Sequence, residues 1–486
     1  MKTGADRMTY LIFAMFAIFL ITSLNISCGG GSSSQSQVFT PVGGGGGGTG
    51  GTGGTGPGSS GSGGGGVEIP PTFFGMTIPA GGQDFPPSGS VPIGALGHPS
   101  TLAWGFIEKS QGTFDFTAFD TYVNDAVQHG LVDSHGVAQV TITFGDTPQW
   151  AAADTSNCTA FTATVVCPSP PAKLSDWTNF VQTVISHYNG TTAPHVKYYE
   201  LWNEASSGNF WTGSIQDLLN LAAIAYPIIH QDPFSQLLTP SVSGPAEGSG
   251  SNNGLTYMTS YLQAGGNKYA DGGTFHGYVA KTNGASISQF PLPEQSSTPS
   301  CASGQDCFGS VITKQTAFRQ LFDSNGLKGK PMLDTEGSWG VNANLPDANQ
   351  EAAWVAQWFI LQAAYYPQIT QAVWFTWGSP AGSGQLESSP GVPNTAGTAY
   401  GQVYNWLVGA TFTGQCSSDS NQTWTCPITR SGGYQALVVW NENGNFSYSP
   451  STAYKQFRDL AGNVSALSGG PITIGTEPFL LENQNP

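Results

Sequence analysis

From residue 73 onward, short apolar segments alternate with amphipathic segments of helical period, and this alternation constrains the fold more than any other feature. A strand followed each time by a helix predicts a parallel sheet, because parallel neighbours need a crossover connection. We expect strands at residues 73–78, 93–96, 137–144, 196–202, 237–240, 274–279, 331–335 and 372–377. We expect helices at residues 116–129, 175–188, 215–230, 255–263, 312–325, 349–366 and 399–408.

Eight strands in this order suit an α/β fold of the (β/α)8 (TIM) barrel type with inserted loops, over residues 67–410. The first helix is missing or irregular, because residues 81–90 are poor helix formers. A doubly wound sheet is the alternative, but no Gly-rich phosphate loop follows the first strand.

The pattern changes after residue 410. Short strands are expected at residues 435–440, 446–448, 453–460 and 471–481, separated by turn residues such as Asn443-Gly444. These predict a small accessory β-sandwich over residues 411–486. Residues 67–69 are a candidate for an additional strand at its edge.

The N-terminus has the order of a signal peptide over residues 1–28. Lys2 and Arg7 precede an apolar run at residues 10–21, which is too short for a comfortable membrane span. Residues 24–29, LNISCG, resemble a bacterial lipoprotein cleavage site, which implies that Cys28 becomes the lipidated first residue. We therefore expect an exported protein at the bacterial cell surface or in the periplasm, touching a membrane only through that anchor. Ordinary cleavage and release is the alternative.

Residues 29–66 are nearly all Gly, Ser and Thr. Such a segment cannot bury apolar surface, so we expect a flexible tether with a reach of roughly 30–40 Å. The chain as a whole carries 14 Lys and Arg against 30 Asp and Glu. This balance excludes nucleic acid as a partner, because phosphate binding needs clustered cations.

Apart from Cys28, the cysteines form three close pairs. Each pair brackets a loop of Ser, Thr, Pro or Gly, which favours three local disulfides: Cys158–Cys167, Cys301–Cys307 and Cys416–Cys426. A metal site is disfavoured, because no pair comes with His at ligand spacing. We expect no metal and no cofactor.

Two glutamates end apolar strands. Glu204 follows Asn203 at the end of one, and Glu336 ends another; by count these are strands four and seven. In a (β/α)8 barrel, catalytic groups sit at the C-terminal ends of strands. Glu200 and Asp334 are the competing acids on the same strands, but both lie deeper and are better suited to structural roles.

These motifs resemble glycoside hydrolase clan A. Asn203-Glu204 resembles the acid/base motif of the clan, and Asp334-Thr335-Glu336-Gly337 resembles its nucleophile strand. Residues 104–116, WGFIEKSQGTFDF, and the C-terminal FRDLAGN at 457–463 are similar to family 39 and its relatives. The resemblance implies a retaining hydrolase of β-glycosidic bonds, with Glu204 as general acid/base and Glu336 as nucleophile.

Neighbouring residues acquire roles by the same logic. The resemblance implies that Asn203 bonds the sugar hydroxyl next to the anomeric carbon, although strand alternation sends Asn203 and Glu204 to opposite faces unless the strand bends. The sixth strand supplies His276 and Tyr278, one of which is expected to orient Glu336 or contact sugar. Other candidates for the cleft are Trp374 and Trp377 as sugar platforms, Trp150 and His98; for each of the three tryptophans, packing in the core is the alternative. Glu108 matches the family pattern, with a loop salt bridge or a turn contact as its alternative.

Two classes of function remain at this stage. The first is an active hydrolase of poly- or oligosaccharides, with a β-xylosidase-like enzyme as the best single substrate hypothesis and an endo-acting β-glucanase as a variant. The second is a surface glycan-binding lipoprotein without turnover. The presence of both acids favours the enzyme, because a binding protein has no need of the pair.

Overall fold

The predicted barrel is confirmed. The computed structural model describes residues 66–78, 85–98, 103–161, 164–242, 254–278, 310–339, 347–378 and 384–485. The predicted signal peptide, Cys28, nearly all of the tether and the Cys301–Cys307 pair lie outside these residues. Eight parallel strands form the central sheet: β1 (Phe74–Met76), β2 (Ala95–Leu96), β3 (Ala138–Thr143), β7 (Val196–Glu200), β8 (Gln236–Leu238), β9 (Gly273–His276), β10 (Met332–Gly337) and β11 (Gln371–Trp374).

The sheet is nearly closed. Its hydrogen-bonding order is β8-β7-β3-β2-β1-β11-β10-β9. A parallel bridge between Leu238 and Gly272 joins its two ends. In chain order, β7 is the fourth barrel strand and β10 the seventh, as the sequence predicts for the strands that lead to Glu204 and Glu336.

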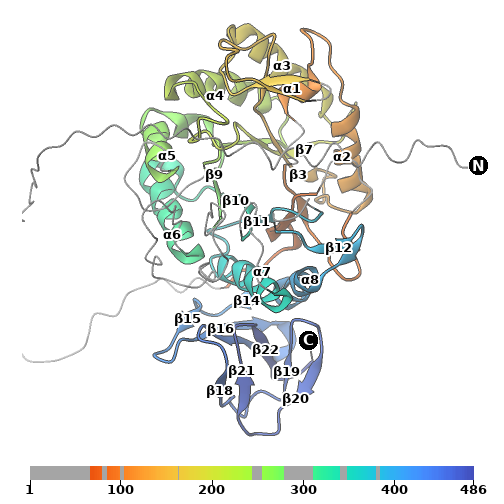
Figure 1. Cartoon of the computed structure of the whole chain (residues 1–486), viewed down its shortest axis with the longest axis vertical. Coiled ribbons are helices and arrows are strands. Elements are labelled where there is room, and N and C mark those ends of the chain that lie inside the picture. The colour runs from red at the N-terminus through yellow and green to blue at the C-terminus, as the bar shows by residue number, and fades with distance from the viewer. Residues whose placement is uncertain are drawn as a thin grey trace, which may run out of the picture. The chain divides into compact units, whose positions relative to one another are not determined.

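Helices surround the strands (Figure 1). They are α1 (Trp104–Ile107), α2 (Thr117–Gln128), α3 (Leu174–His187), α4 (Ile215–Ile229), α5 (Gly254–Gln263), α6 (Val311–Phe322), α7 (Ala348–Ala363) and α8 (Thr395–Leu407). The seven predicted helices correspond to α2–α8. The short helix α1 was not predicted, and residues 85–94, before β2, contain no helix.

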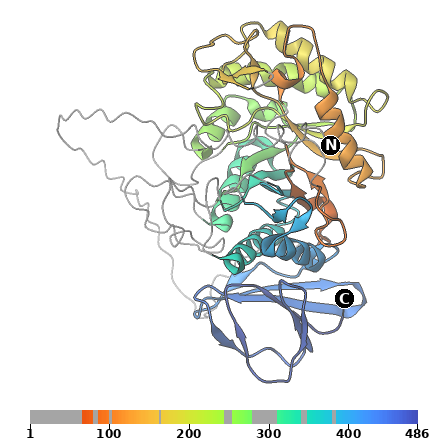
Figure 2. The ribbon, with the colours of Figure 1, turned by 45° about the vertical axis from the view of Figure 1, so that its right-hand side comes forward.

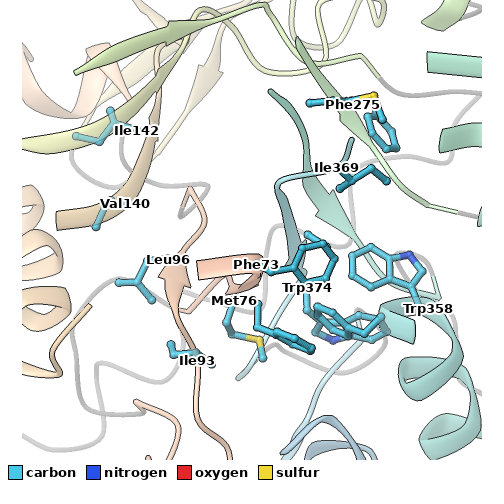
Figure 3. Packing of buried hydrophobic residues seen from close by; sticks show 14 of the residues in the cluster. Phe73, Met76, Ile93, Leu96, Val140, Ile142, Phe275, Trp358, Ile369 and Trp374 are labelled. Atoms are coloured by element: carbon cyan, nitrogen blue, oxygen red, sulfur yellow. The ribbon is translucent and has the colours of Figure 1, made fainter. Parts of the chain in front are cut away.

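Helical periodicity explains how these elements pack. On α3, the buried residues Trp177, Phe180, Val181 and Val184 fall at the spacing of one helix face. The Trp177 ring lies 5.5 Å from that of Phe144, which follows β3. Between β11 and α7, Trp374 packs beside Trp358, with ring centroids 5.3 Å apart (Figure 3). The core therefore lies largely between the barrel and its helices.

Antiparallel sheets follow the barrel, and their strands form a separate group without intervening α-helices (Figure 2). A seven-stranded sheet contains β14 (Thr411–Phe412), β15 (Ser417–Ser418), β16 (Thr423–Arg430), β17 (Tyr434–Asn441), β19 (Gln456–Arg458), β20 (Val464–Ala466) and β22 (Phe479–Glu482). A two-stranded sheet contains β18 (Phe446–Tyr448) and β21 (Ile472–Ile474). Val439, Leu481 and Ile474 form a small core between the two sheets.

The segment before the barrel corrects one expectation. Residues 67–69 form no strand of the sandwich: Ile69 makes a single parallel bridge with Val408, and its N–H donates to the carbonyl of Ala410. Two of the predicted disulfides, Cys158–Cys167 and Cys416–Cys426, are present. The first closes a small sheet of β4 (Thr147–Pro148), β5 (Thr159–Ala160) and β6 (Val165–Cys167). Within the described residues, no helix is both long enough and apolar enough to cross a membrane.

Candidate active site

The chain leaves strand geometry before it reaches Glu204. β7 ends at Glu200, and Glu204 has a φ of 39°, in the left-handed region that residues other than glycine rarely adopt. Its N–H donates to Oγ of the buried Ser241 at 3.1 Å. The bend resolves the problem posed by strict alternation, because Asn203 and Glu204 no longer have to point to opposite faces.

A bulge changes which acid of β10 faces inward. The register shifts between Asp334 and Glu336 against β9, and between Asp334 and Gly337 against β11. Asp334 points outward and lines a small cavity with residues of α6 and α7. Thr335 points into the barrel, where its hydroxyl bonds Glu200 at 2.8 Å. Asp334 and Glu336, which simple parity places on one face, are thus separated.

His276 and Tyr278 join the two glutamates. Phe275 stacks on Phe318 of α6, so its neighbour His276 faces the barrel interior. The His276 Nδ1 lies 2.8 Å from Glu204 Oε1 and 3.6 Å from Glu336 Oε2. The Tyr278 hydroxyl donates to Glu336 Oε1 at 2.5 Å. Four of the residues proposed from the sequence therefore lie in one cluster.

The short distances in this cluster change the pKa values of His276 and Glu336. Burial by itself lowers the pKa of His276, but the nearby Glu336 and Glu204 carboxylates outweigh it and raise that pKa to about 9. Burial raises the pKa of Glu336, while the His276 charge and the Tyr278 hydrogen bond oppose the rise. His276 and Tyr278 thus favour the ionised form of Glu336.

Glu200 has the structural surroundings expected for it. It is buried, and its carboxylate accepts hydrogen bonds from Thr143 at 3.1 Å and Thr335 at 2.8 Å. These partners come from β3 and β10, so Glu200 ties three strands together inside the barrel. Burial raises the pKa of Glu200, while the charge of His276 and the hydrogen bonds that Glu200 accepts oppose the rise.

His98 lies beside the cluster. Its Nδ1 accepts the N–H of Thr143 at 3.2 Å. Burial, followed by the nearby His276 charge, lowers its pKa to about 3. A neutral ring with Nδ1 as acceptor carries its proton on Nε2, so His98 presents a hydrogen-bond donor there. Asn203 is half-buried beside Glu204.

The tryptophans correct part of the sequence hypothesis. Trp374 is 0% exposed, packs between β11 and α7, and donates its indole N–H to the Gly384 carbonyl (Figure 3). It is a core residue, so of the two alternatives at Trp374 the structure has packing and not a sugar platform. Trp377 is also fully buried. Trp150 is half-buried and donates its indole N–H to the Glu108 carbonyl at 3.0 Å.

Alternation explains the error at Trp374. Glycine occupies positions 75 and 97, where a Cβ would lie within 2.4 to 2.7 Å of Val373 methyl groups, so Val373 fills the interior. Phe375 follows β11, and its N–H donates to the carbonyl of Gly337 on β10, so the pairing of these strands continues to Phe375. Because side chains alternate along a strand, Phe375 points to the same side as Val373. This half-buried aromatic residue, not predicted from the sequence, has the inward position proposed for Trp374.

Two other residues have roles in the local structure. Ser241 was not predicted, although a polar residue directly after an expected strand is a usable signal. Glu108 is buried and accepts the Trp104 indole N–H and the Gly112 N–H, both at 2.8 Å. It therefore makes the turn contact given above as its alternative.

Among the described residues, no group of three His, Cys, Asp or Glu is arranged to hold a metal ion.

No protein-family profile matches this chain, and no curated protein sequence matches it. Its structure, in contrast, is similar to solved glycoside hydrolases. A family 39 glycoside hydrolase from Bacteroides cellulosilyticus WH2 has a TM-score of 0.61 and 16% identity, with 85% of this chain and 81% of that chain covered.

Two further solved structures of glycoside hydrolases are similar to this chain. A monomeric β-xylosidase from Caulobacter crescentus CB15 has a TM-score of 0.56 and 15% identity, covering 86% of this chain and 97% of that chain. A family 30 endoxylanase from Clostridium papyrosolvens C71 has a TM-score of 0.54 and 12% identity, covering 87% and 98%. The chain therefore shares the fold of these glycoside hydrolases. In this fold, Glu204 follows the fourth barrel strand, β7, and Glu336 lies near the end of the seventh, β10.

Proposed function

We propose that this protein is a retaining glycoside hydrolase that cleaves β-glycosidic bonds in poly- or oligosaccharides, with Glu204 as general acid/base and Glu336 as nucleophile. The observation that carries the proposal is the contact of both carboxyl groups with one nitrogen of His276. Because one nitrogen lies 2.8 Å from a Glu204 oxygen and 3.6 Å from a Glu336 oxygen, the two carboxyl groups face each other across His276, an arrangement compatible with the close pair (~5–5.5 Å) that double displacement needs.

The first step is attack by Glu336 on the anomeric carbon. A bond forms between a Glu336 carboxylate oxygen and that carbon, while the glycosidic bond breaks and the leaving oxygen takes the Glu204 proton. The product is a covalent glycosyl-enzyme with inverted configuration. Tyr278 and His276 support this step, because they hold Glu336 ionised and aimed.

The second step restores the enzyme. Glu204, now ionised, accepts a proton from water as that water attacks the anomeric carbon, and the bond to Glu336 breaks. Two inversions give net retention. His276 adjoins both carboxyl groups and is suited to balance the charge as it moves from one glutamate to the other.

The names of similar structures guide the choice of substrate. A β-xylosidase and an endoxylanase are among them, so we propose β-xylosides and xylan as the first substrates to test. Within a (β/α)8 barrel, the loops after the strands decide specificity. β-Glucans and β-galactosides therefore belong in the same panel.

Covalent trapping tests the proposal. We expect a 2-deoxy-2-fluoro-β-xylosyl fluoride, or its gluco or galacto analogue, to increase the protein mass by one sugar, on the peptide that contains Glu336. Glu336→Ala removes the adduct, whereas the exposed Glu68→Ala, as a matched control, keeps it. Glu204→Ala forms the intermediate with activated aryl glycosides and is rescued by azide to give a β-glycosyl azide. A protein that binds glycans but forms no adduct with any sugar is a binding protein without turnover.

We also propose that the protein is exported and held at a membrane by lipid on Cys28. The basic, apolar and small-residue order of residues 1–28 supports this, and the Gly-rich tether supplies the distance from the surface. Expression in a bacterial host tests it by fractionation. Wild-type protein is expected in the membrane fraction and Cys28→Ser in the soluble one; equal distribution of both argues for ordinary secretion.

A further inference from the structure

Lys314 is a buried lysine that the proposed mechanism does not use. It lies on α6 and is only 1% exposed. A charged lysine on an amphipathic helix usually faces water, because burial of an ammonium group is costly without hydrogen bonds and a counter-charge. The surroundings of Lys314 therefore have to supply both.

The hydrogen bond of Lys314 leads to the nucleophile. Its Nζ donates to the backbone carbonyl of Tyr278 at 2.9 Å. The hydroxyl of the same Tyr278 donates to Glu336. β9 ends at His276, so the strand ladder ends two residues before this carbonyl. Lys314 thus fixes a backbone position from which the Tyr278 side chain reaches Glu336.

Asp334 supplies the counter-charge. It is 1% exposed, lies two residues before Glu336, and its Oδ1 accepts the Gly277 N–H at 2.8 Å. It lines the same small cavity as Lys314. Burial lowers the pKa of Lys314 and raises that of Asp334, and in each case the charge of the other opposes the shift.

Gly277 shows how closely Asp334 packs against this segment. A Cβ at position 277 would lie 1.7 Å from Asp334 Oδ2, so only glycine allows the carboxylate to lie against the backbone. The Gly277–Tyr278 segment is consequently held at both ends: Asp334 accepts its first N–H, and Lys314 donates to its last carbonyl.

We propose that Lys314 is a positioning residue for the nucleophile: with Asp334 as a neighbouring counter-charge, it holds the Gly277–Tyr278 segment so that the Tyr278 hydroxyl meets Glu336. The inference rests on the proposed function, because it assigns Lys314 to the same reaction. Lys314 acts through Tyr278 and does not itself contact the glycoside.

A double-mutant cycle tests this dependence. We expect Lys314→Met to lower kcat by about 10- to 100-fold, with KM nearly unchanged, because a hydrogen bond to an ionised nucleophile is weakened. Lys314→Arg restores part of the rate. In a Tyr278→Phe background, Lys314→Met has little further effect, because the hydroxyl through which it acts is absent.

Lys330→Met is the matched control. Lys330 also donates to a backbone carbonyl, that of Ala270, but it lies just before β10, at the opposite end of that strand from Glu336. Its substitution is expected to lower the melting temperature and leave kcat unchanged. If Lys314→Met does not fold, Lys314→Met with Asp334→Asn removes the unpaired buried carboxylate and takes its place in the cycle.

The outcomes separate this inference from the proposed function. Wild-type kcat in folded Lys314→Met, or losses that simply multiply in the Tyr278→Phe background, would overturn the positioning role. Inactivity of the wild type with every glycoside counts against the proposed function instead. A crystal structure of Lys314→Met then decides the inference independently: a displaced Tyr278 hydroxyl supports it, and an unchanged contact with Glu336 overturns it.

Discussion

The Tyr278 hydroxyl donates a hydrogen bond of 2.5 Å to Oε1 of Glu336. This bond opposes the rise in the pKa of Glu336 that burial causes. Tyr278→Phe therefore raises the pKa of the nucleophile, and the acidic limb of the kcat/KM profile moves to higher pH. Hydrogen bonds to charged groups are worth ~1.5–3 kcal/mol, which predicts a loss of ~10- to 150-fold in kcat.

Steady-state kinetics from pH 4 to 9 check this prediction. Tyr448→Phe is a suitable control, because this half-buried tyrosine lies on β18, in the C-terminal sheets. A Tyr278→Phe enzyme with the wild-type profile would show that the hydroxyl has no influence on the nucleophile.

His276 predicts how stability changes with pH. Its pKa is raised from 6.5 to about 9 in the folded protein by the Glu336 and Glu204 carboxylates, against the effect of burial. The folded state therefore binds this proton more tightly than the unfolded state. The resulting stability is fully present below pH 6.5 and is lost as the pH rises through 9.

His276→Asn removes this contribution. We expect the variant to be less stable than wild type at pH 6, with a difference that shrinks towards pH 9.5. Urea unfolding of both proteins at several pH values measures it as a difference in the free energy of unfolding. A difference that stays constant or grows with pH contradicts a charged His276 between the two glutamates.

Ser241 is predicted to control the position of Glu204. Its Oγ accepts the Glu204 N–H, and Ser241→Ala leaves that donor without its partner, at a cost of ~1–3 kcal/mol. Because Glu204 is also displaced, kcat falls more than KM changes. Ser235→Ala is the matched control: this buried serine lies just before β8 and donates to the carbonyl of Val196, at the start of β7, so its loss lowers stability but not kcat. Equal kcat losses in the two variants contradict a specific role for Ser241.

Sequence patterns located the barrel and the two acids for clear reasons. Apolar runs and helical periodicity mark strands and helices wherever a buried face is long enough, and Glu204 and Glu336 stand out because charge rarely ends an apolar strand. The strand β16 was missed because its Cys426 and Pro427 indicate a disulfide-bracketed loop. Its pairing with β17 depends on residues distant in sequence.

The errors near the site have a common physical origin. A bulge in β10 leaves no mark in the residue pattern, yet it turns Asp334 away from Glu336. Which face of β11 Trp374 occupies depends on which side Val373 fills, and that side is set by the space that Gly75 on β1 and Gly97 after β2 leave for Val373. Lys314 looks like a solvated helix residue until the fold brings Tyr278 and Asp334 to it.

Backbone strain gives a final prediction. Besides Glu204, Asp146 and Gln422 are the described residues other than glycine with positive φ, at 52° and 62°. Left-handed backbone costs residues with a side chain ~1–2 kcal/mol, so glycine at either position is expected to raise stability by about 1 kcal/mol. Gln422 is exposed before β16, and Gln422→Gly should leave activity unchanged.

Asp146 is different, because it lies at the same end of the barrel as Asn203. Thr143 at the end of β3 pairs with Glu200 at the end of β7; Asp146 comes three residues after Thr143, and Asn203 three residues after Glu200. Burial raises its pKa to about 6. Strain held beside an active site suggests function, so Asp146→Gly should raise the melting temperature and lower kcat/KM. Asp146→Asn, which keeps the side chain but not its charge, separates the two effects. Thermal unfolding and kinetics on the same samples measure both, and an Asp146→Gly enzyme that is more stable and fully active would make Asp146 an ordinary turn residue.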